Sequence, residues 1–159
     1  MVRRPVAVLF GLLLLAGTAC GTGTQPAPQP GDLNAAATPN LGTIVTDAGG
    51  HTLYRFDEDT ARPPVSHCYD QCAADWSPVL ATTGTITIQG LDQHLIATTT
   101  RADGSQQITL GGWPLYHCRK DTIPGVTAGQ GDGGSWFAVR PDGGKATTTA
   151  PSSSDSGGY

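Results

Sequence analysis

The sequence predicts an all-β domain: a small antiparallel sandwich or barrel-like fold built from two pseudo-symmetric units. Short runs of β-branched and aromatic residues alternate with glycine-rich turns, a pattern typical of strands joined by hairpins. No stretch of this region keeps apolar residues at helical spacing for more than about two turns, and only residues 68–76 predict a short helix. A third observation is that the sequence motif around Leu53 and Tyr54 recurs 62 residues later, around Leu115 and Tyr116.

The predicted strands follow one another from residue 41 to about residue 143. "GTIVTDAGGHTLYRF" contains two strand-like runs around the turn Asp47–Gly50. Residues 83–90 and 94–118 continue the pattern, and "GSWFAVRPDGG" supplies a last strand. We expect seven or eight short antiparallel strands, which is the regime of sandwiches and barrels.

The repeat divides the domain into two units of about 60 residues, at about 41–80 and 81–143. Each unit contains a Gly-Gly turn, a Leu-Tyr pair, an Asp-Thr pair and, after a loop, a tryptophan. The aligned pairs are Gly50 and Gly112, Leu53 and Leu115, Tyr54 and Tyr116, and Asp59 and Asp121. Two units are too few for a solenoid, so we expect a pseudo-twofold pair that shares one core.

The first 19 residues have the features of a signal peptide. Arg3 and Arg4 precede an apolar run over 6–16, which is too short to span a bilayer as a helix. Small residues follow, and then Cys20. This order resembles a bacterial lipobox, although Gly17 stands where leucine is usual, so we expect Cys20 to carry lipid. The alternative is cleavage by the ordinary signal peptidase, with Cys20 as an incidental thiol.

Low-complexity sequence flanks the domain on both sides. Residues 20–40 are rich in Pro, Gly, Ala, Thr and Gln, which predicts a flexible linker after the lipidated cysteine. Residues 144–159 predict a disordered tail. Removal of the signal peptide changes the formal net charge from −4 to −6. Because no basic patch is present, we expect no nucleic-acid partner, and membrane contact only through the N-terminal lipid.

The repeated aromatic motif has a structural and a functional interpretation. Tyr54 and Phe56 point to one face of a strand and Leu53 to the other, because side chains alternate along a strand. An aromatic pair on one face packs a small core, and Asp59 can accept hydrogen bonds from the N–H groups of a turn. The functional alternative makes Tyr54, Phe56 and Tyr116 a ledge on which a ligand stacks. We favour the core.

Cys68, Cys72 and Cys118 are an odd number of thiols for an oxidising compartment. A disulfide between Cys68 and Cys72 requires a distorted turn, since residues four apart in a regular helix are too distant. Cys118 could instead bridge to either of them. A further alternative joins all three thiolates with His67 in a tetrahedral site suited to zinc or cuprous copper.

The ordered motifs resemble a family of bacterial secreted lipoproteins, the "secreted repeat of unknown function" with a Tyr-x-aromatic-x-x-Asp motif. The matching residues of the first unit are Gly50, Leu53, Tyr54, Phe56, Asp59, Cys68 and Cys72, and those of the second are Gly112, Leu115, Tyr116 and Asp121. Two positions depart from the family: Ser77 replaces a proline, and Cys118 replaces the second aromatic. The resemblance implies an extracytoplasmic, membrane-anchored domain without an established activity. It also implies a Cys68–Cys72 bridge, which leaves Cys118 as a buried thiol.

The sequence contains none of the hydrolase, phosphate-binding or metalloprotease motifs that carry catalysis. We therefore expect a non-catalytic, lipid-anchored protein on the outer face of a bacterial cell membrane, with no cofactor, that binds or scaffolds an unidentified protein or envelope component. The alternative function is a copper-, zinc- or thiol-redox-handling lipoprotein that uses Cys68, Cys72, Cys118 and a nearby histidine.

Overall fold

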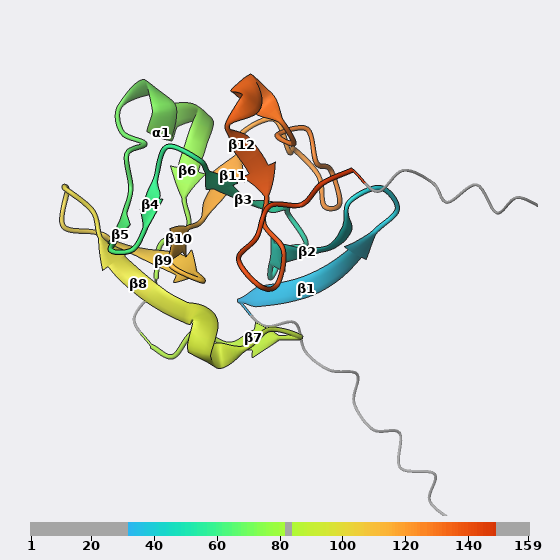
Figure 1. The fold of residues 1–159 in the computed structure, drawn as a ribbon, viewed down its shortest axis with the longest axis horizontal. Helices are drawn as coiled ribbons and strands as arrows, with labels where there is room; N and C mark the ends of the chain where they lie inside the picture. The colour runs from blue at the N-terminus through green and yellow to red at the C-terminus, as the bar shows by residue number, and fades with distance from the viewer. Residues whose placement is uncertain (1–31, 82–83, 149–159) are drawn as a thin grey trace, which may run out of the picture.

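The computed structural model describes residues 32–81 and 84–148 (Figure 1). The signal peptide, Cys20, the first part of the linker and the end of the tail lie outside the described residues. None of the helices in the described ranges is long and apolar enough to cross a membrane.

Short strands dominate the described chain, as the sequence predicts, with one α-helix and two 3₁₀ helices. The first strands are β1 (Leu33–Thr38), β2 (Gly42–Asp47), β3 (Leu53–Phe56), β4 (Thr60–Ala61), β5 (Pro64–Val65) and β6 (Trp76–Pro78), with α1 (Gln71–Asp75) before β6. The later strands are β7 (Ile88–Gln89), β8 (Ile96–Thr100), β9 (Gln106–Leu110), β10 (Trp113–Pro114), β11 (Tyr116–Cys118) and β12 (Trp136–Ala138). The 3₁₀ helices are η1 (Gln93–Leu95) and η2 (Asp132–Gly134). The strands outnumber the predicted seven or eight because several hold only two residues.

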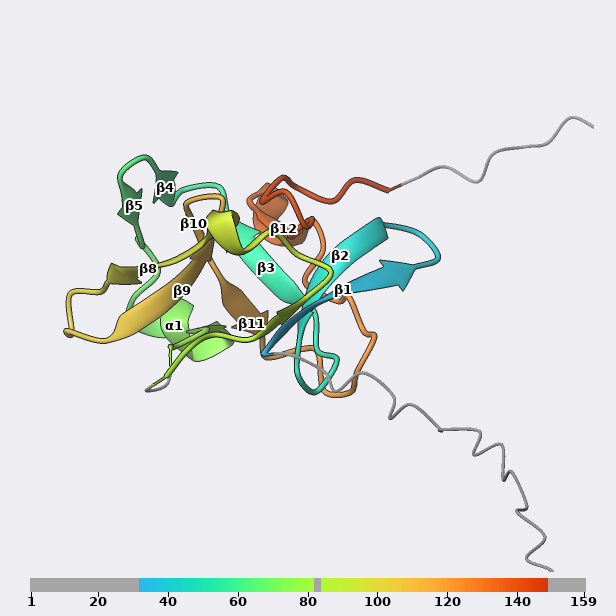
Figure 2. The ribbon, with the colours of Figure 1, turned by 90° about the horizontal axis from the view of Figure 1, so that it is seen from below.

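The strands form an antiparallel four-stranded sheet and three smaller sheets, and in the described ranges no barrel closes. The four-stranded sheet has the order β12-β3-β11-β6. Beside it lie the sheets β2-β1-β7 and β10-β9-β8 and the ribbon β4-β5. Figure 2 shows β3 running between the β1–β2 hairpin on one side and the β8–β9 pair on the other. The named strands of the described ranges pair antiparallel, as the sequence predicts, except β1 with β7, which is parallel.

The domain begins before residue 41, where the sequence predicts only a flexible linker. Strand β1 pairs with β2 along its whole length, from Leu33 opposite Asp47 to Thr38 opposite Gly42. Its side chains are mostly alanine and threonine, so the composition resembles a tether. The backbone hydrogen bonds and the fully buried Leu33 nevertheless hold this segment in the fold. The flexible-linker prediction is therefore wrong for residues 33–38.

The domain also ends later than expected. The backbone N–H of Ala146 donates to the carbonyl of Ala138 at 2.8 Å, and Val139 forms an isolated bridge with Lys145. Ala146 is fully buried. Small side chains made this segment look like disordered tail, but the same small size lets Ala146 fit inside the core. The tail prediction is wrong for residues 144–146.

The predicted turn after β2 is present, but it joins two different sheets. The backbone N–H of Asp47 donates to the carbonyl of His51, and Thr46 bridges Thr52. Gly50 and its repeat equivalent Gly112 both have positive φ, 83° and 89°. This backbone conformation favours glycine over residues with a Cβ, which explains the recurrence of glycine in both units. Of the strand expected over 83–90, the described residues 84–90 form only the two-residue strand β7.

Two hydrophobic clusters cover the two faces of the four-stranded sheet. Strand β3 is buried on both faces: Tyr54 and Phe56 belong to one cluster and Leu53 to the other, as their alternation predicts. The aromatic cluster comprises Leu41, Ile44, Tyr54, Phe56, Cys68, Trp76, Tyr116, Cys118, Trp136, Ala138 and Ala146. The aliphatic cluster comprises Leu33, Val45, Leu53, Val79, Ile108, Leu110, Leu115 and Val139.

The two repeat units exchange strands. Tyr54 of β3 stands opposite Tyr116 of β11, so equivalent residues meet at the centre of the sheet, as a pseudo-twofold axis requires. The edge strand of the first unit, β6, pairs with β11 of the second unit. The edge strand of the second unit, β12, pairs with β3 of the first. Neither unit therefore builds its own half of the sheet.

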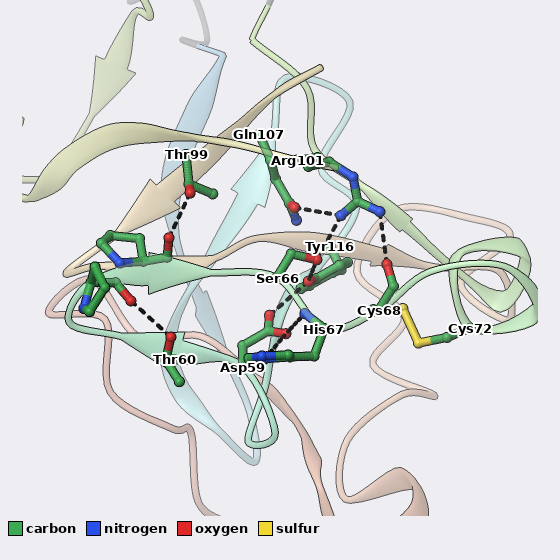
Figure 3. Close-up of polar contacts among 12 residues, drawn as sticks. Asp59, Thr60, Ser66, His67, Cys68, Cys72, Thr99, Arg101, Gln107 and Tyr116 are labelled. Carbon is green, nitrogen blue, oxygen red and sulfur yellow. Dashed lines mark hydrogen bonds and ion pairs between the residues drawn. A yellow bond between two sulfur atoms is a disulfide. The ribbon is translucent and has the colours of Figure 1, made fainter. Parts of the chain in front are cut away.

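A disulfide joins Cys68 to Cys72, across the irregular turn that opens the short helix α1 (Figure 3). Asp70, between them, has a φ of 50°, so the backbone here departs from a regular helix. A disulfide between cysteines four residues apart requires a distorted turn, and this irregular backbone provides it. Cys118 is a free, buried cysteine, and the alternatives in which it bridges Cys68 or Cys72 are wrong.

Removal of the disulfide should lower the free energy of unfolding by about 2 kcal/mol, because the bridge closes only a short loop. Urea denaturation of a Cys68→Ser, Cys72→Ser variant measures this loss. Thiol titration of the denatured chain with Cys20→Ser should detect Cys118 alone before reduction, and Cys68 and Cys72 in addition after it. Reactivity of all three cysteines before reduction contradicts the assignment.

Candidate functional site

The motif residues of the two units form two reciprocal hydrogen bonds at the centre of the domain. The Tyr54 hydroxyl donates to Oδ2 of Asp121 at 2.6 Å. The Tyr116 hydroxyl donates to Oδ2 of Asp59 at 2.7 Å. Each tyrosine thus bonds to the aspartate of the other unit. The sequence identifies all four residues, but it does not reveal this exchange of partners.

The second oxygen of each aspartate holds the loop that follows it. Oδ1 of Asp59 accepts from the backbone N–H of His67 at 2.7 Å. Oδ1 of Asp121 accepts from the backbone N–H of Ala128 at 2.9 Å. The expected backbone donor for Asp59 is therefore present, but it comes from the later loop and not from the adjacent turn. Each carboxylate ties together its own loop and a strand of the other unit.

Burial shifts the acid–base equilibria of these four groups in the same direction. It raises the pKa of the Asp59 and Asp121 carboxyls, an effect that their hydrogen-bond donors partly oppose. Burial and the neighbouring carboxylates also raise the pKa of Tyr54 and Tyr116 far above the ordinary phenol value. The two phenols therefore stay protonated and remain donors at any physiological pH.

A buried guanidinium from the second unit extends the network around Asp59 (Figure 3). Arg101 donates through Nη1 to the Ser66 hydroxyl at 2.8 Å and to Oε1 of Gln107 at 2.7 Å. Through Nη2 it donates to the carbonyl of Cys68 at 2.7 Å. The Ser66 hydroxyl lies 2.8 Å from the Tyr116 hydroxyl, and so links the cation to the tyrosine–aspartate pair.

These hydrogen bonds connect the buried Arg101 guanidinium to the Asp59 carboxylate through two hydroxyl groups, those of Ser66 and Tyr116. Arg101 and Asp59 are each only 4% exposed, so each charge lies in a region where unpaired charges are costly. Their arrangement supports the structure and leaves no face of either group open to a substrate. Sequence analysis missed Arg101, because a single arginine after a run of threonines carries no signal of burial.

The tryptophans of the two units stack on each other above the tyrosines. The Trp76 and Trp136 rings are 3.9 Å apart and nearly parallel, at 3°. Tyr54 meets Trp76 edge-on at 5.3 Å, and Tyr116 meets Trp136 in the same way at 5.1 Å. A Cβ at Gly129 would come within 2.6 Å of the Trp76 ring, so only glycine fits there.

The rings of the motif belong to the core and do not form an exposed ledge. Tyr54 and Tyr116 are fully buried, and Phe56 is 8% exposed. Phe56 stacks on Trp136, with ring centres 4.2 Å apart and planes at 12°. The aromatic motif is thus a structural device, which agrees with the favoured interpretation of the sequence.

The proposed metal ligands do not assemble into a site. The sulfurs of Cys68 and Cys72 are bonded to each other, and the side chain of His67 is half exposed beside Asp59. Burial raises the pKa of the Cys118 thiol, which favours its neutral form. Across residues 32–81 and 84–148, no group of three or more His, Cys, Asp or Glu side chains is placed to hold a metal ion.

A cavity of about 140 Å³ opens beside the aromatic cluster, next to Trp76 and Cys118. Its rim consists of charged residues that pair with each other: Arg119 with Asp75 at 3.5 Å, and Lys120 with Asp132 at 2.8 Å. This cavity is the candidate binding site, because it combines an aromatic ring with a polar opening. The larger hollow of about 430 Å³ around Leu41 and Arg140 is polar and has no aromatic wall.

Loss of either tyrosine hydroxyl should destabilise the domain by about 1–3 kcal/mol, because each leaves a buried carboxylate oxygen without its donor. Urea denaturation of Tyr54→Phe and Tyr116→Phe measures the loss. Tyr69→Phe is the matched control, since the Tyr69 ring lies against Arg101 and its hydroxyl takes no part in either tyrosine–aspartate pair. Equal stabilities of all three variants would contradict the assigned role.

Acidification should strengthen the contribution of Asp59 and Asp121 to stability. Their pKa values in the folded state lie above the ordinary 3.8. Between pH 3.8 and these raised values, the folded state therefore binds more protons than the unfolded state. Their contribution is complete below pH 3.8 and is lost as the pH rises through the native pKa values. Carboxyl ¹³C NMR should show both titrating above 3.8, and the exposed Asp103 below it, since bonds from Ser105 lower the Asp103 pKa. Native pKa values of Asp59 and Asp121 below 3.8 would refute this.

One protein family matches the chain, and its description is a secreted repeat of unknown function. The match covers residues 35–80 and 97–140, which are the two units and more than half of the chain. The first match begins within β1, in agreement with the early start of the domain. No curated protein and no solved structure shows significant similarity to the chain. The two matched repeats place this chain in the family of secreted repeats of unknown function.

Proposed function

We propose that this protein is a non-catalytic binding or scaffolding domain, held at the outer face of a bacterial cell membrane by lipid on Cys20. Membership in a family of secreted repeats implies an extracellular or envelope location. The basic start, the short apolar run and the small residues before Cys20 support the lipid anchor. Several acyl chains at one cysteine would supply the multiple lipid signals that stable anchoring requires.

The observation that carries the non-catalytic role is the internal use of the motif's reactive groups. Asp59 and Asp121 are each bonded to a buried tyrosine and to a backbone N–H. Arg101 is enclosed by Ser66, Gln107 and the backbone. A catalytic acid, base or nucleophile must reach the substrate, and these groups face one another instead.

The proposed anchor would keep the domain close to the membrane. The segment between Cys20 and Asp32 extends at most about 40 Å. Asp32 itself is fixed to the domain, because its carboxylate accepts from the backbone N–H of Thr87 at 2.8 Å. Such a short tether suits a protein that meets its partner within the cell envelope.

Copper, zinc or thiol-redox handling gains no support from the site geometry. Two of the three thiols it needs are joined as Cys68–Cys72, and the remaining Cys118 is a buried free thiol. We therefore do not propose it as a second function.

Replacement of Cys20 by serine should move the protein from the membrane fraction to the medium. Cys118→Ser is the matched control, since it removes a thiol elsewhere and should leave the protein membrane-bound. Mass spectrometry of the N-terminus of the parent protein should find lipid on Cys20. An unmodified N-terminus downstream of Cys20, or a Cys20→Ser variant that stays with the membrane, would overturn the anchor.

The released Cys20→Ser chain also tests the binding role. Incubated with washed envelope fragments, it should sediment with them in a saturable way that unlabelled protein competes. Sedimentation that stays proportional to added protein, or none at all, would overturn the proposed envelope partner.

A further inference from the structure

The internal repeat provides a template for interpreting the cavity beside Trp76. In the first unit, Phe56 stands opposite Trp136 on the neighbouring strand, and the two rings stack at 4.2 Å. In the second unit, the equivalent of Phe56 is Cys118, which stands opposite Trp76 on the neighbouring strand. The same strand geometry therefore places a ring on one tryptophan and only a thiol beside the other.

The difference in side-chain size accounts for the position of the cavity. Trp136 has a ring on both sides, since it stacks on Phe56 and on Trp76. Trp76 stacks on Trp136 and has Cys118 where a further ring would complete the layer. The cavity of about 140 Å³ is lined by Trp76 and Cys118 together with the four charged residues of its rim.

The size of the cavity matches one six-membered ring. A cavity of roughly 150 Å³ lined by apolar side chains is large enough to bind benzene, and this cavity is of similar volume although charged side chains also line it. The wall here includes an indole, which favours a planar ring in an offset or parallel stack over a saturated ring of the same volume. Cys118 is 5% exposed, so its thiol forms part of the wall and leaves the entrance to other residues.

The rim determines which substituent the ring can carry. Arg119 and Asp75 pair on it, and so do Lys120 and Asp132. The four side chains carry both signs of charge, and each charge already has a partner. The rim offers hydrogen bonds, and its formal charges sum to zero. It therefore suits an uncharged polar group such as a hydroxyl.

We propose that the cavity beside Trp76 and Cys118 binds the planar ring of a small, uncharged aromatic molecule with one polar substituent, stacked on Trp76 in the place that Phe56 fills in the first unit. This proposal rests on the proposed binding function, to which it assigns a class of ligand. The envelope and fractionation experiments test the anchor and the partner. A ring-binding experiment in solution succeeds or fails independently of them.

Phenol is the probe, and cyclohexanol is its non-planar control of similar size and polarity. Each is titrated into the full secreted chain carrying Cys20→Ser, while ¹H–¹⁵N NMR follows the indole N–H of Trp76, assigned by its loss in Trp76→Phe. Phenol should cause a saturable shift. Cyclohexanol should bind at least about threefold more weakly, because it cannot stack. The absence of saturation with phenol, or equal binding of cyclohexanol, would overturn the proposal.

Variants at Cys118 locate the site. Cys118→Phe supplies the missing ring from the chain itself, and should weaken phenol binding at least about tenfold. Val65→Ala changes an exposed side chain that does not line the cavity, and this control should bind phenol as the parent does. If the phenylalanine variant does not fold, Cys118→Leu fills part of the same space and should reduce phenol affinity as well. A filled variant that folds and binds phenol like the parent refutes the site.

Discussion

The reciprocal hydrogen bonds between the tyrosines and aspartates are the constraint on which this fold depends. Each carboxylate is buried, and burial of an unpaired charge would cost more than a small domain can offset. The phenol of the other unit and the backbone of the following loop meet that requirement together. One motif thereby fixes the separation of the two central strands, the position of two long loops and the relation between the repeats.

The remaining architecture follows from this central exchange. Because Tyr54 and Tyr116 stand opposite each other in β3 and β11, the edge strands that flank them come from the opposite units. Those edge strands bring Trp76 and Trp136 over the tyrosines, where the indoles stack at 3.9 Å. Symmetry ends at the outer layer, since Phe56 has no aromatic counterpart in the second unit. The two units therefore match at the shared centre and differ at the periphery.

Sequence reasoning identified the repeat, the strand-rich fold and the motif residues. The alternation of apolar residues and the recurrence of the motif can both be read directly from the order of residues. It could not identify the exchange, since equivalence between Tyr54 and Tyr116 does not say which aspartate each one meets. It misjudged β1, because alanine and threonine do not distinguish a paired strand from a tether. It also missed Arg101, whose burial depends on acceptors that the sequence does not connect to it: Ser66, Gln107 and the Cys68 carbonyl. The Cys68–Cys72 pairing was indicated by the family resemblance and not by spacing.

The exchange of strands also bears on the order in which the domain can fold. The partners of the central bonds are 67 and 57 residues apart, so the first unit cannot complete its core until most of the second has emerged. A topology dominated by distant contacts folds slowly. The leading half alone lacks the tyrosine and the aspartate that its own motif residues bond to, and it lacks the strands β11 and β12 that pair with β3. An intertwined repeat therefore completes its core only when both halves of the chain are present.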